Sequence, residues 1–129
     1  MQARILVIED DPASLELLKY LLESTGHDVH TAVDGAAGLR AALESEYELI
    51  LCDLQMPHLN GYEVIARLRE DARRNAVPVI AVTAYSMPGD RDAALEAGFA
   101  EYLTKPVDPE TFVATINRFL ETGHLPGPA

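Results

Sequence analysis

Five short apolar runs, separated by longer segments with helical spacing, constrain the fold of this chain more than any other feature. The third run contains Leu49–Cys52 without a polar interruption, which is typical of a strand buried on both faces of a parallel sheet. The second run is more polar and is expected at or near a sheet edge. The expected strands cover residues 4–9, 27–32, 47–53, 78–83 and 100–104. Strands that alternate with helices predict an α/β protein, with helices on both faces of one parallel sheet.

Capping residues mark where most of the expected helices begin, because a short polar side chain can accept a hydrogen bond from the first helical turn. The four predicted caps are Asp11, Asp34, Asn60 and Asp108. The segment over residues 89–97 has the weakest helical signal, since it is short, rich in alanine and bounded by glycines. The arginines in and after the third helix are expected to lie on a solvated face; they are Arg67, Arg69, Arg73 and Arg74. We assign residues 1–123 to one domain and residues 124–129 to a flexible tail.

The excess of acidic over basic side chains makes some classes of function unfavourable. The chain has 129 residues, with 21 acidic and 10 basic side chains, so its formal net charge is −11. This charge disfavours binding to nucleic acid or to an anionic membrane, which require Lys and Arg contacts to phosphate. Cys52 is the only cysteine, so no intrachain disulfide can form, and we expect a small buried side chain there. The first apolar run is too short for a signal peptide or a membrane span, and we expect a cytoplasmic protein.

Polar side chains follow four of the five expected strands. Glu9 and Asp10 lie at the end of the first strand, and Asp53, Thr83 and Lys105 belong to the ends of the third, fourth and fifth. Right-handed crossovers bring these strand ends to one edge of the sheet, where ligands bind in doubly wound folds. Carboxylates this close repel each other unless a cation compensates, and Mg²⁺ with oxygen ligands suits them. An aspartate can act as a nucleophile toward phosphorus, and phosphoryl transfer mainly needs charge neutralisation and positioning.

Four motifs closely resemble the receiver domain of bacterial two-component response regulators. They are ILVIEDD (5–11), LILCDLQMPHLNG (49–61), VIAVTAY (79–85) and YLTKPV (102–107), and together they extend over nearly the whole chain. The resemblance implies a doubly wound, flavodoxin-like fold with five parallel strands in the order 2-1-3-4-5, similar to single-domain chemotaxis regulators.

The same resemblance implies a role for each matching residue. Asp53 would be the phosphoacceptor, and Asp10 would bind Mg²⁺ directly together with Asp53. The backbone carbonyl of Gln55 would be a further ligand, and Glu9 would act through a water molecule. Mn²⁺ is the alternative metal.

Further positions of the family pattern concern the phosphoryl group and the response to it. Thr83 and Lys105 would bind the phosphoryl group, and Thr83 would act with Tyr102 as the conformational switch. The peptide bond before Pro106 is expected to be cis. Gln55 and Tyr85 occupy positions that shape the access of water to the phosphoryl group, and the bulk of Tyr85 favours slow self-dephosphorylation.

The expected function is that of a phosphoacceptor in a two-component or phosphorelay pathway. A histidine kinase or histidine phosphotransfer protein would donate the phosphoryl group, and the first helix either docks this donor or packs its Leu15 at the rim. The face formed by the helix over 89–97, the strand over 100–104 and the last helix would then bind a downstream protein. We expect a monomer or weak dimer without a DNA-binding output domain, which catalyses only its own phosphorylation and dephosphorylation.

Three alternatives differ from this interpretation. The chain could be a receiver segment excised from a hybrid histidine kinase. A phosphatase of the haloacid dehalogenase type would place a second aspartate two residues after Asp53, where this chain has Gln55. A flavodoxin-like FMN binder would need a loop rich in Ser, Thr and Gly after the first strand, where three acidic residues stand instead.

Overall fold

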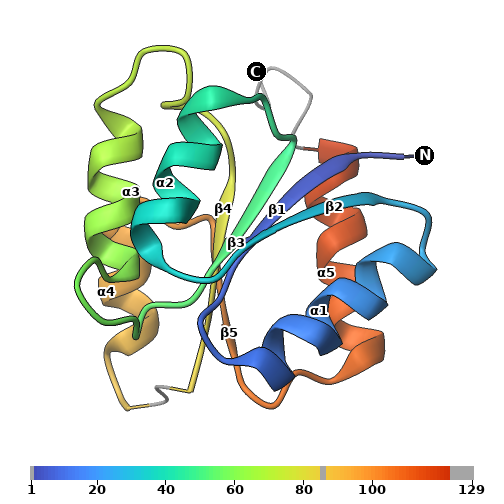
Figure 1. Cartoon of the computed structure of the whole chain (residues 1–129). Helices are drawn as coiled ribbons and strands as arrows, with labels where there is room; N and C mark the ends of the chain where they lie inside the picture. Colours follow the sequence, from blue (N-terminus) through green and yellow to red (C-terminus); the bar gives the residue numbers. More distant parts are fainter. Residues whose placement is uncertain (1, 85–86, 123–129) are drawn as a thin grey trace.

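One parallel sheet organises the molecule, which is described by a computed structural model at residues 2–84 and 87–122. In that part of the chain the strand order is β2-β1-β3-β4-β5, as expected, with all neighbouring strands parallel. The strands are β1 (Arg4–Ile8), β2 (Asp28–Ala32), β3 (Leu49–Cys52), β4 (Val79–Thr83) and β5 (Glu101–Thr104). Their carboxyl ends all point to the lower edge of the sheet in Figure 1. β2 is an edge strand, which explains its polar sequence.

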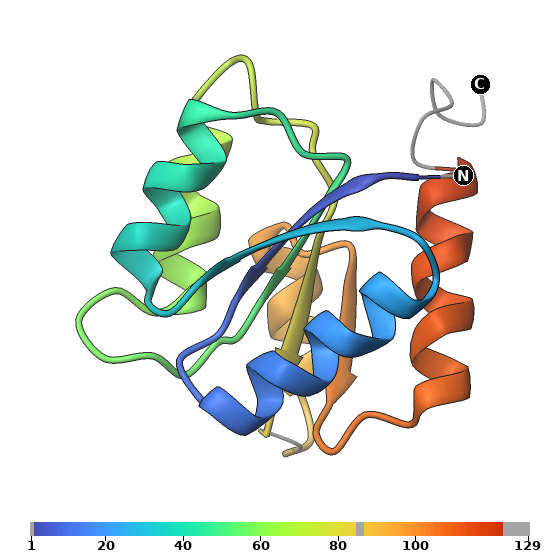
Figure 2. The same cartoon turned by 45° about the vertical axis from the view of Figure 1, so that its right-hand side comes forward.

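Helices cover both faces of this sheet. They are α1 (Pro12–Ser24), α2 (Gly35–Glu44), α3 (Gly61–Arg69), α4 (Asp90–Ala97) and α5 (Pro109–Thr122). α2, α3 and α4 lie on one face, and α1 and α5 lie on the other (Figure 1). Figure 2 shows α1 passing in front of the sheet with α5 beside it. No helix among the described residues has the length and apolar character needed to cross a membrane.

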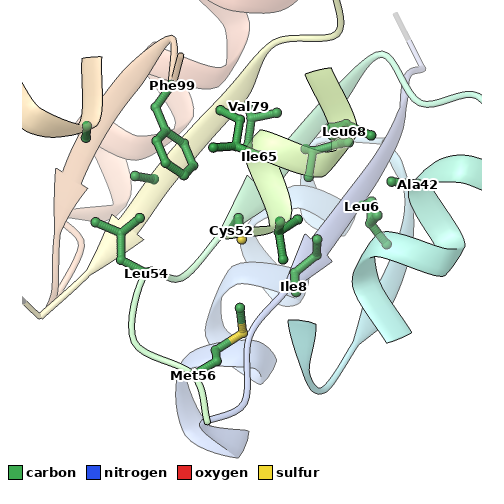
Figure 3. Close-up of a cluster of buried hydrophobic side chains, with 14 of the residues drawn as sticks. Leu6, Ile8, Ala42, Cys52, Leu54, Met56, Ile65, Leu68, Val79 and Phe99 are labelled. Carbon is green, nitrogen blue, oxygen red and sulfur yellow. The ribbon is translucent and has the colours of Figure 1, made fainter. Parts of the chain in front are cut away.

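The alternation of side chains along the strands gives the molecule two cores. In β1, Leu6 and Ile8 face α2, α3 and α4, whereas Ile5 and Val7 face α1 and α5, because successive strand residues point to opposite faces. Figure 3 shows the first core, in which Cys52 is buried as expected. Burial of both faces holds the central strands rigidly, and this rigidity fixes where their carboxyl ends lie.

Side-chain caps begin α1, α2 and α3 where the sequence predicted them. Asp11 accepts a hydrogen bond from the backbone N of Ser14, and Asn60 forms a reciprocal capping box with Glu63. Such caps stabilise a helix by about 1 kcal/mol each. α4 begins differently, at Gly89, which has a φ of 91° and no side-chain cap hydrogen bond. This backbone start agrees with the weak helical signal of the segment.

The prediction that four arginines lie on a solvated face is correct for only two of them. Arg67 and Arg73 are exposed, but Arg74 is buried and Arg69 is half-buried. The cause is the chain after α3, which turns back so that both guanidinium groups reach backbone carbonyls. Arg69 donates to the carbonyls of Val77 and Gly98, and Arg74 donates to that of Ala42. Neither contact follows from the spacing of charges in the sequence, because the acceptors lie on other elements.

Candidate functional site

Four strand ends bring their polar side chains together at the lower edge of the sheet. Glu9 follows β1 directly, and Asp53 follows β3. Thr83 is the last residue of β4, and Lys105 follows β5. The backbone continues its ladder past the strand ends, since Asp53 N donates to the carbonyl of Ile8 (3.0 Å) and Lys105 N to that of Thr83 (2.9 Å). The main chain, and not only the side chains, therefore fixes these groups relative to one another.

Lys105 stands between two buried carboxylates. Its Nζ atom lies 2.6 Å from Oε1 of Glu9 and 3.0 Å from Oδ2 of Asp53. Glu9 is 1% exposed and Asp53 is 5% exposed, so both carboxylates are largely removed from water. Burial raises the pKa of Glu9, although the Lys105 ammonium acts against this rise. Burial alone would lower the pKa of Lys105, but the two carboxylates outweigh it and raise that pKa. The ammonium therefore stays charged and compensates two acids at once.

The carboxylates of Glu9, Asp10 and Asp53 fit a divalent cation. Each offers an oxygen, and these oxygens all lie within 4.8 Å of one another. The two oxygens of Glu9 are already engaged, because Oε1 pairs with Lys105 and Oε2 accepts from the backbone N of Asp11 (3.0 Å). Asp10 is exposed and has no hydrogen-bond or ion-pair partner among the described residues. Hard oxygen donors with one free carboxylate are what Mg²⁺ takes, since it retains several waters.

The loop after β3 returns to the strand end that carries Asp53. Oδ1 of Asp53 accepts a hydrogen bond from the backbone N of Gln55 (3.1 Å), whose side chain is exposed. Gly61 begins α3 so close to this strand end that an added Cβ would lie 2.4 Å from the carbonyl oxygen of Asp53. Its N donates to the carbonyl of Leu54 (3.2 Å). No role at the site is predicted for Gly61 from the sequence, and the Asn60-Gly61 pair is the only local signal for it.

The remaining predicted residues lie as follows. Thr83 is fully buried in β4, the strand beside that of Asp53. Tyr102 is 8% exposed and belongs to the core under α2, α3 and α4. The Lys105–Pro106 peptide bond is cis. Tyr85, predicted to control phosphoryl lifetime, lies outside the described residues, as does the expected tail over 124–129.

Known proteins share this arrangement of sequence and fold. The family model described as the response regulator receiver domain matches residues 5–117. Protein PilH of Pseudomonas aeruginosa is 40% identical over 118 residues, which cover 92% of this chain and 98% of PilH. The DNA-binding dual master transcriptional regulator RpaA of Synechocystis is also 40% identical, over 95% of this chain but only 52% of RpaA.

A solved receiver-domain structure that contains a magnesium ion is also similar to this chain. The receiver domain of the sensor histidine kinase PA1611 from Pseudomonas aeruginosa has a magnesium ion coordinated in its active-site cleft. It superposes with a TM-score of 0.86 at 32% identity, over 94% of this chain and 99% of that domain. The same domain thus occurs in a protein of similar length, in a DNA-binding regulator and in a kinase. Because the family model matches far more than half of the sequence, this chain belongs to the response regulator receiver domain family.

Proposed function

We propose that Asp53 accepts a phosphoryl group from a phosphohistidine on a histidine kinase or histidine phosphotransfer protein, in a Mg²⁺-dependent reaction. The observation that carries this proposal is the position of Lys105, whose Nζ lies within 3.0 Å of Asp53 while also compensating Glu9. A lysine held there pairs with the carboxylate that would attack the phosphorus. It also places a positive charge where the phosphoryl oxygens arrive, which is the main requirement of phosphoryl transfer.

The reaction forms one bond and breaks one. An oxygen of Asp53 attacks the phosphorus, the bond between phosphorus and the donor imidazole nitrogen breaks, and the imidazole leaves with its electron pair and takes up a proton. Glu9, Asp10 and Asp53 would hold Mg²⁺, which supplies positive charge to the transferring phosphoryl group. Lys105 pairs with one phosphoryl oxygen, and the hydroxyl of Thr83 donates to another. The chain thereby promotes its own phosphorylation and acts on no other substrate.

A groove beside Lys105 suits docking of the donor protein. It has a volume of about 310 Å³ and lies between α1 and the segment that joins β5 to α5. Leu17 and Leu18 of α1 line one side, and Pro106 and Val107 line the other, with Lys105 in the same lining. Leu17 is 39% exposed and Tyr20, on the same helix, is 68% exposed. An apolar surface that leads to the acceptor site would bring a donor histidine within reach of Asp53.

The face made by α4, β5 and α5 is the proposed output surface. Glu101 of β5 pairs with Arg91 of α4 and with Arg118 of α5, so one carboxylate links the three elements. The next residue, Tyr102, is already buried inside the molecule. We infer that phosphorylation draws Thr83 toward the new charge and stabilises the inward position of Tyr102. This is a shift of population between two states, and a downstream protein would bind the favoured one.

Phosphorylation by acetyl phosphate tests the acceptor assignment without any partner protein. Intact-mass spectrometry should detect one added phosphoryl group in the presence of Mg²⁺ and none after its removal with EDTA. Asp53→Asn should abolish the gain, whereas Asp28→Asn, the same change at the opposite edge of the sheet, should leave it unchanged. Full labelling of the Asp53→Asn variant would refute the proposal.

Docking is tested separately with a protein donor. Leu17→Ser should slow transfer from a phosphorylated histidine phosphotransfer protein about tenfold, because an exposed apolar anchor in an interface contributes roughly 1–2 kcal/mol. The same variant should react normally with acetyl phosphate, which needs no docking surface. Equal rates with both donors for the variant and the original chain would remove the groove from the proposal and leave the acceptor assignment intact.

A further inference from the structure

A cavity lies at the edge of the sheet opposite the phosphoryl site, and the proposed function does not use it. It has a volume of about 410 Å³. Its lining comes from the amino end of β1, the chain just before β3, and the segment that joins α3 to β4. That last segment lies at the top of Figure 1. Cavities of 300–1,000 Å³ are the usual size of small-molecule sites.

Arginines are concentrated in this cavity. Arg4, Arg73 and Arg74 line it, although the whole chain has only 10 basic residues and a net charge of −11. Glu46 and Glu48 also line it, so the cavity presents both signs of charge. Glu48 is partly engaged, because it accepts a hydrogen bond from the backbone N of Arg4 (3.2 Å). Arg4 pairs with Asp28 (3.8 Å) and Arg73 pairs with Asp71 (3.1 Å), so the lining as a whole disfavours an extended polyanion, and any anion bound here must use donors that these pairs leave free.

Arg74 is the unusual member of the lining. It is 8% exposed, and it forms no direct ion pair among the described residues, although the nearby Asp71 carboxylate interacts with its charge. Its Nε donates to the carbonyl of Ala42 (2.8 Å) and its Nη1 to that of Arg73 (3.4 Å). Its Nη2 has no protein acceptor within the described part of the chain. An anionic ligand in the cavity would accept a charge-assisted hydrogen bond from this nitrogen.

The walls around Arg74 are held in place before any ligand arrives. Asp71 binds the guanidinium of Arg73 through both of its oxygens, at 3.3 and 3.1 Å. The hydroxyl of Tyr47 lies 3.3 Å from Nδ1 of His30, and the guanidinium of Arg4 lies over the Tyr47 ring at 5.3 Å from its centre. A site with fixed walls loses little conformational entropy when it binds, which favours affinity for a small ligand.

A second arginine fixes the loop that carries Arg74. Nη1 of Arg69 donates to the carbonyls of Arg74 (3.3 Å) and Val77 (2.8 Å), and its Nη2 donates to that of Gly98, at the end of α4 (3.2 Å). The backbone around the free guanidinium edge is thus tied to α3 and α4. The position of the loop that carries Arg74 is therefore set by the fold.

We propose that this cavity binds a small organic oxyanion, a carboxylate or a phosphate, through Arg74 and Arg73, with the body of the ligand against Tyr47 and Val77. Planar guanidinium groups match the paired oxygens of carboxylates and phosphates. The apolar part of the ligand lies on the aromatic and aliphatic lining, and Glu46 and Glu48 at the same cavity select against large polyanions. The site is separate from Asp53 and does not depend on phosphorylation.

Two probe anions test the proposal in amide NMR titrations at constant ionic strength and without Mg²⁺. Inorganic phosphate represents the phosphate source, and benzoate represents an aromatic carboxylate. Saturable shifts should appear at residues 46–48 and 73–78, with a dissociation constant on the order of 1 mM for probes this small. Tighter binding of one probe identifies the oxyanion class, and either result supports the site. Shifts that rise linearly without saturation, or that centre on Asp53 and Lys105, would overturn it.

Matched variants test which arginines contribute to the affinity for the probe anion. Arg73→Gln, at an exposed position, should weaken the tighter probe at least fivefold while the protein remains folded. Arg74→Gln should abolish saturable binding, with folding checked by circular dichroism because that side chain is buried. Arg40→Gln removes the same charge from an exposed position outside the lining and should leave affinity unchanged. Equal affinity in the Arg73→Gln and Arg40→Gln variants would refute the proposal even if Arg74→Gln fails to fold.

Discussion

The two edges of the sheet use charge in opposite ways. At the carboxyl ends of the strands, Glu9 and Asp53 are buried beside one ammonium, and Asp10 is exposed, with no partner in the part of the chain that the structure describes. At the amino ends, guanidinium groups donate to backbone carbonyls on neighbouring elements, as Arg69 and Arg74 do. The first edge concentrates carboxylates that repel one another. At the second edge, the guanidinium N–H groups of Arg69 and Arg74 stabilise the fold through hydrogen bonds to backbone carbonyls.

The comparison shows that the effect of a buried charged side chain depends on the groups with which it is paired. Carboxylates that exceed their counter-charges attract a cation, and that cation together with Lys105 supplies the positive charge that an incoming phosphoryl group needs. Guanidinium groups bonded to carbonyls stabilise loops and helix ends, since a hydrogen bond from a charged donor contributes roughly 1.5–3 kcal/mol. The following changes therefore should affect reactivity at one edge and stability at the other.

The largest effect is expected from Lys105→Met. Removal of the ammonium takes away the charge nearest to Asp53 and should slow phosphorylation by acetyl phosphate about 100-fold, as loss of one electrostatic stabiliser does in other sites. Mg²⁺ should bind more tightly, because Lys105 no longer competes for Glu9 and Asp53. Quench-flow labelling and a calorimetric Mg²⁺ titration measure the two quantities. Lys19→Met, which changes the only other lysine, should alter neither. Weaker Mg²⁺ binding by Lys105→Met would contradict this account.

Gly61→Ala should reduce both stability and reactivity. The new Cβ would lie 2.4 Å from the carbonyl oxygen of Asp53, so the strand end or α3 must move, at a cost of about 2 kcal/mol of unfolding free energy. Phosphorylation should slow severalfold because Asp53 moves with its backbone.

Gly26→Ala gives the comparison at the opposite edge. Nothing lies within 4 Å of its added Cβ, but a φ of 93° strains alanine by about 1 kcal/mol. Urea denaturation should detect that loss with no change in phosphorylation rate. A slowed rate in Gly26→Ala would show that general destabilisation, not displacement of Asp53, explains the Gly61 result.

Arg69→Met should lower stability without affecting chemistry. The change removes hydrogen bonds to the carbonyls of Arg74, Val77 and Gly98, and we expect a loss of about 2 kcal/mol, since the group is only half-buried. Thermal unfolding measures it. Arg67→Met, on the exposed side of the same helix, should change stability by less than about 0.5 kcal/mol. Equal losses of unfolding free energy in the two variants would mean that the hydrogen bonds of Arg69 contribute nothing to stability.

The smallest effect concerns His27, which lies at the same edge as the arginines. Its Nδ1 accepts a hydrogen bond from the backbone N of Ala3 (3.1 Å), which requires a neutral ring. Burial lowers the pKa of His27 below 6.5, although Glu48 acts in the opposite direction. The unfolded chain therefore takes up the proton first. Stability from this group is complete above about pH 6.5 and declines as the pH falls toward the folded pKa.

His27→Gln should remove this dependence. The slope of unfolding free energy between pH 6.5 and 5.5 should be smaller in the variant, by at most about 1.4 kcal/mol per pH unit, the limit for one proton. Urea denaturation at several pH values measures the unfolding free energy of the original chain and of the variant. The difference between their pH curves separates the effect of His27 from that of the carboxylates, which titrate at lower pH. Parallel curves would show that His27 is protonated equally in the folded and unfolded chains.

Local signals account for what the sequence predicted well. The strand order follows from the resemblance, and the apolar runs and the caps at Asp11 and Asn60 locate the elements, because periodicity and capping act over a few residues. The convergence of Glu9, Asp53, Thr83 and Lys105 was also predictable, since parallel strands put their carboxyl ends at one edge. These are properties that neighbouring residues and a fixed handedness dictate.

Contacts between distant elements were decided only by the tertiary structure. The sequence placed Arg69 and Arg74 among exposed charges, but their acceptors, Gly98 and Ala42, lie 29 and 32 residues away. The closeness of Gly61 to the carbonyl of Asp53 and the double pairing of Lys105 likewise depend on how loops return to the sheet. Sequence alone determined which groups reach the carboxyl-end edge of the sheet, because strand direction is local information. The fold determined which charges are buried and what they meet, because burial depends on every element packed around them.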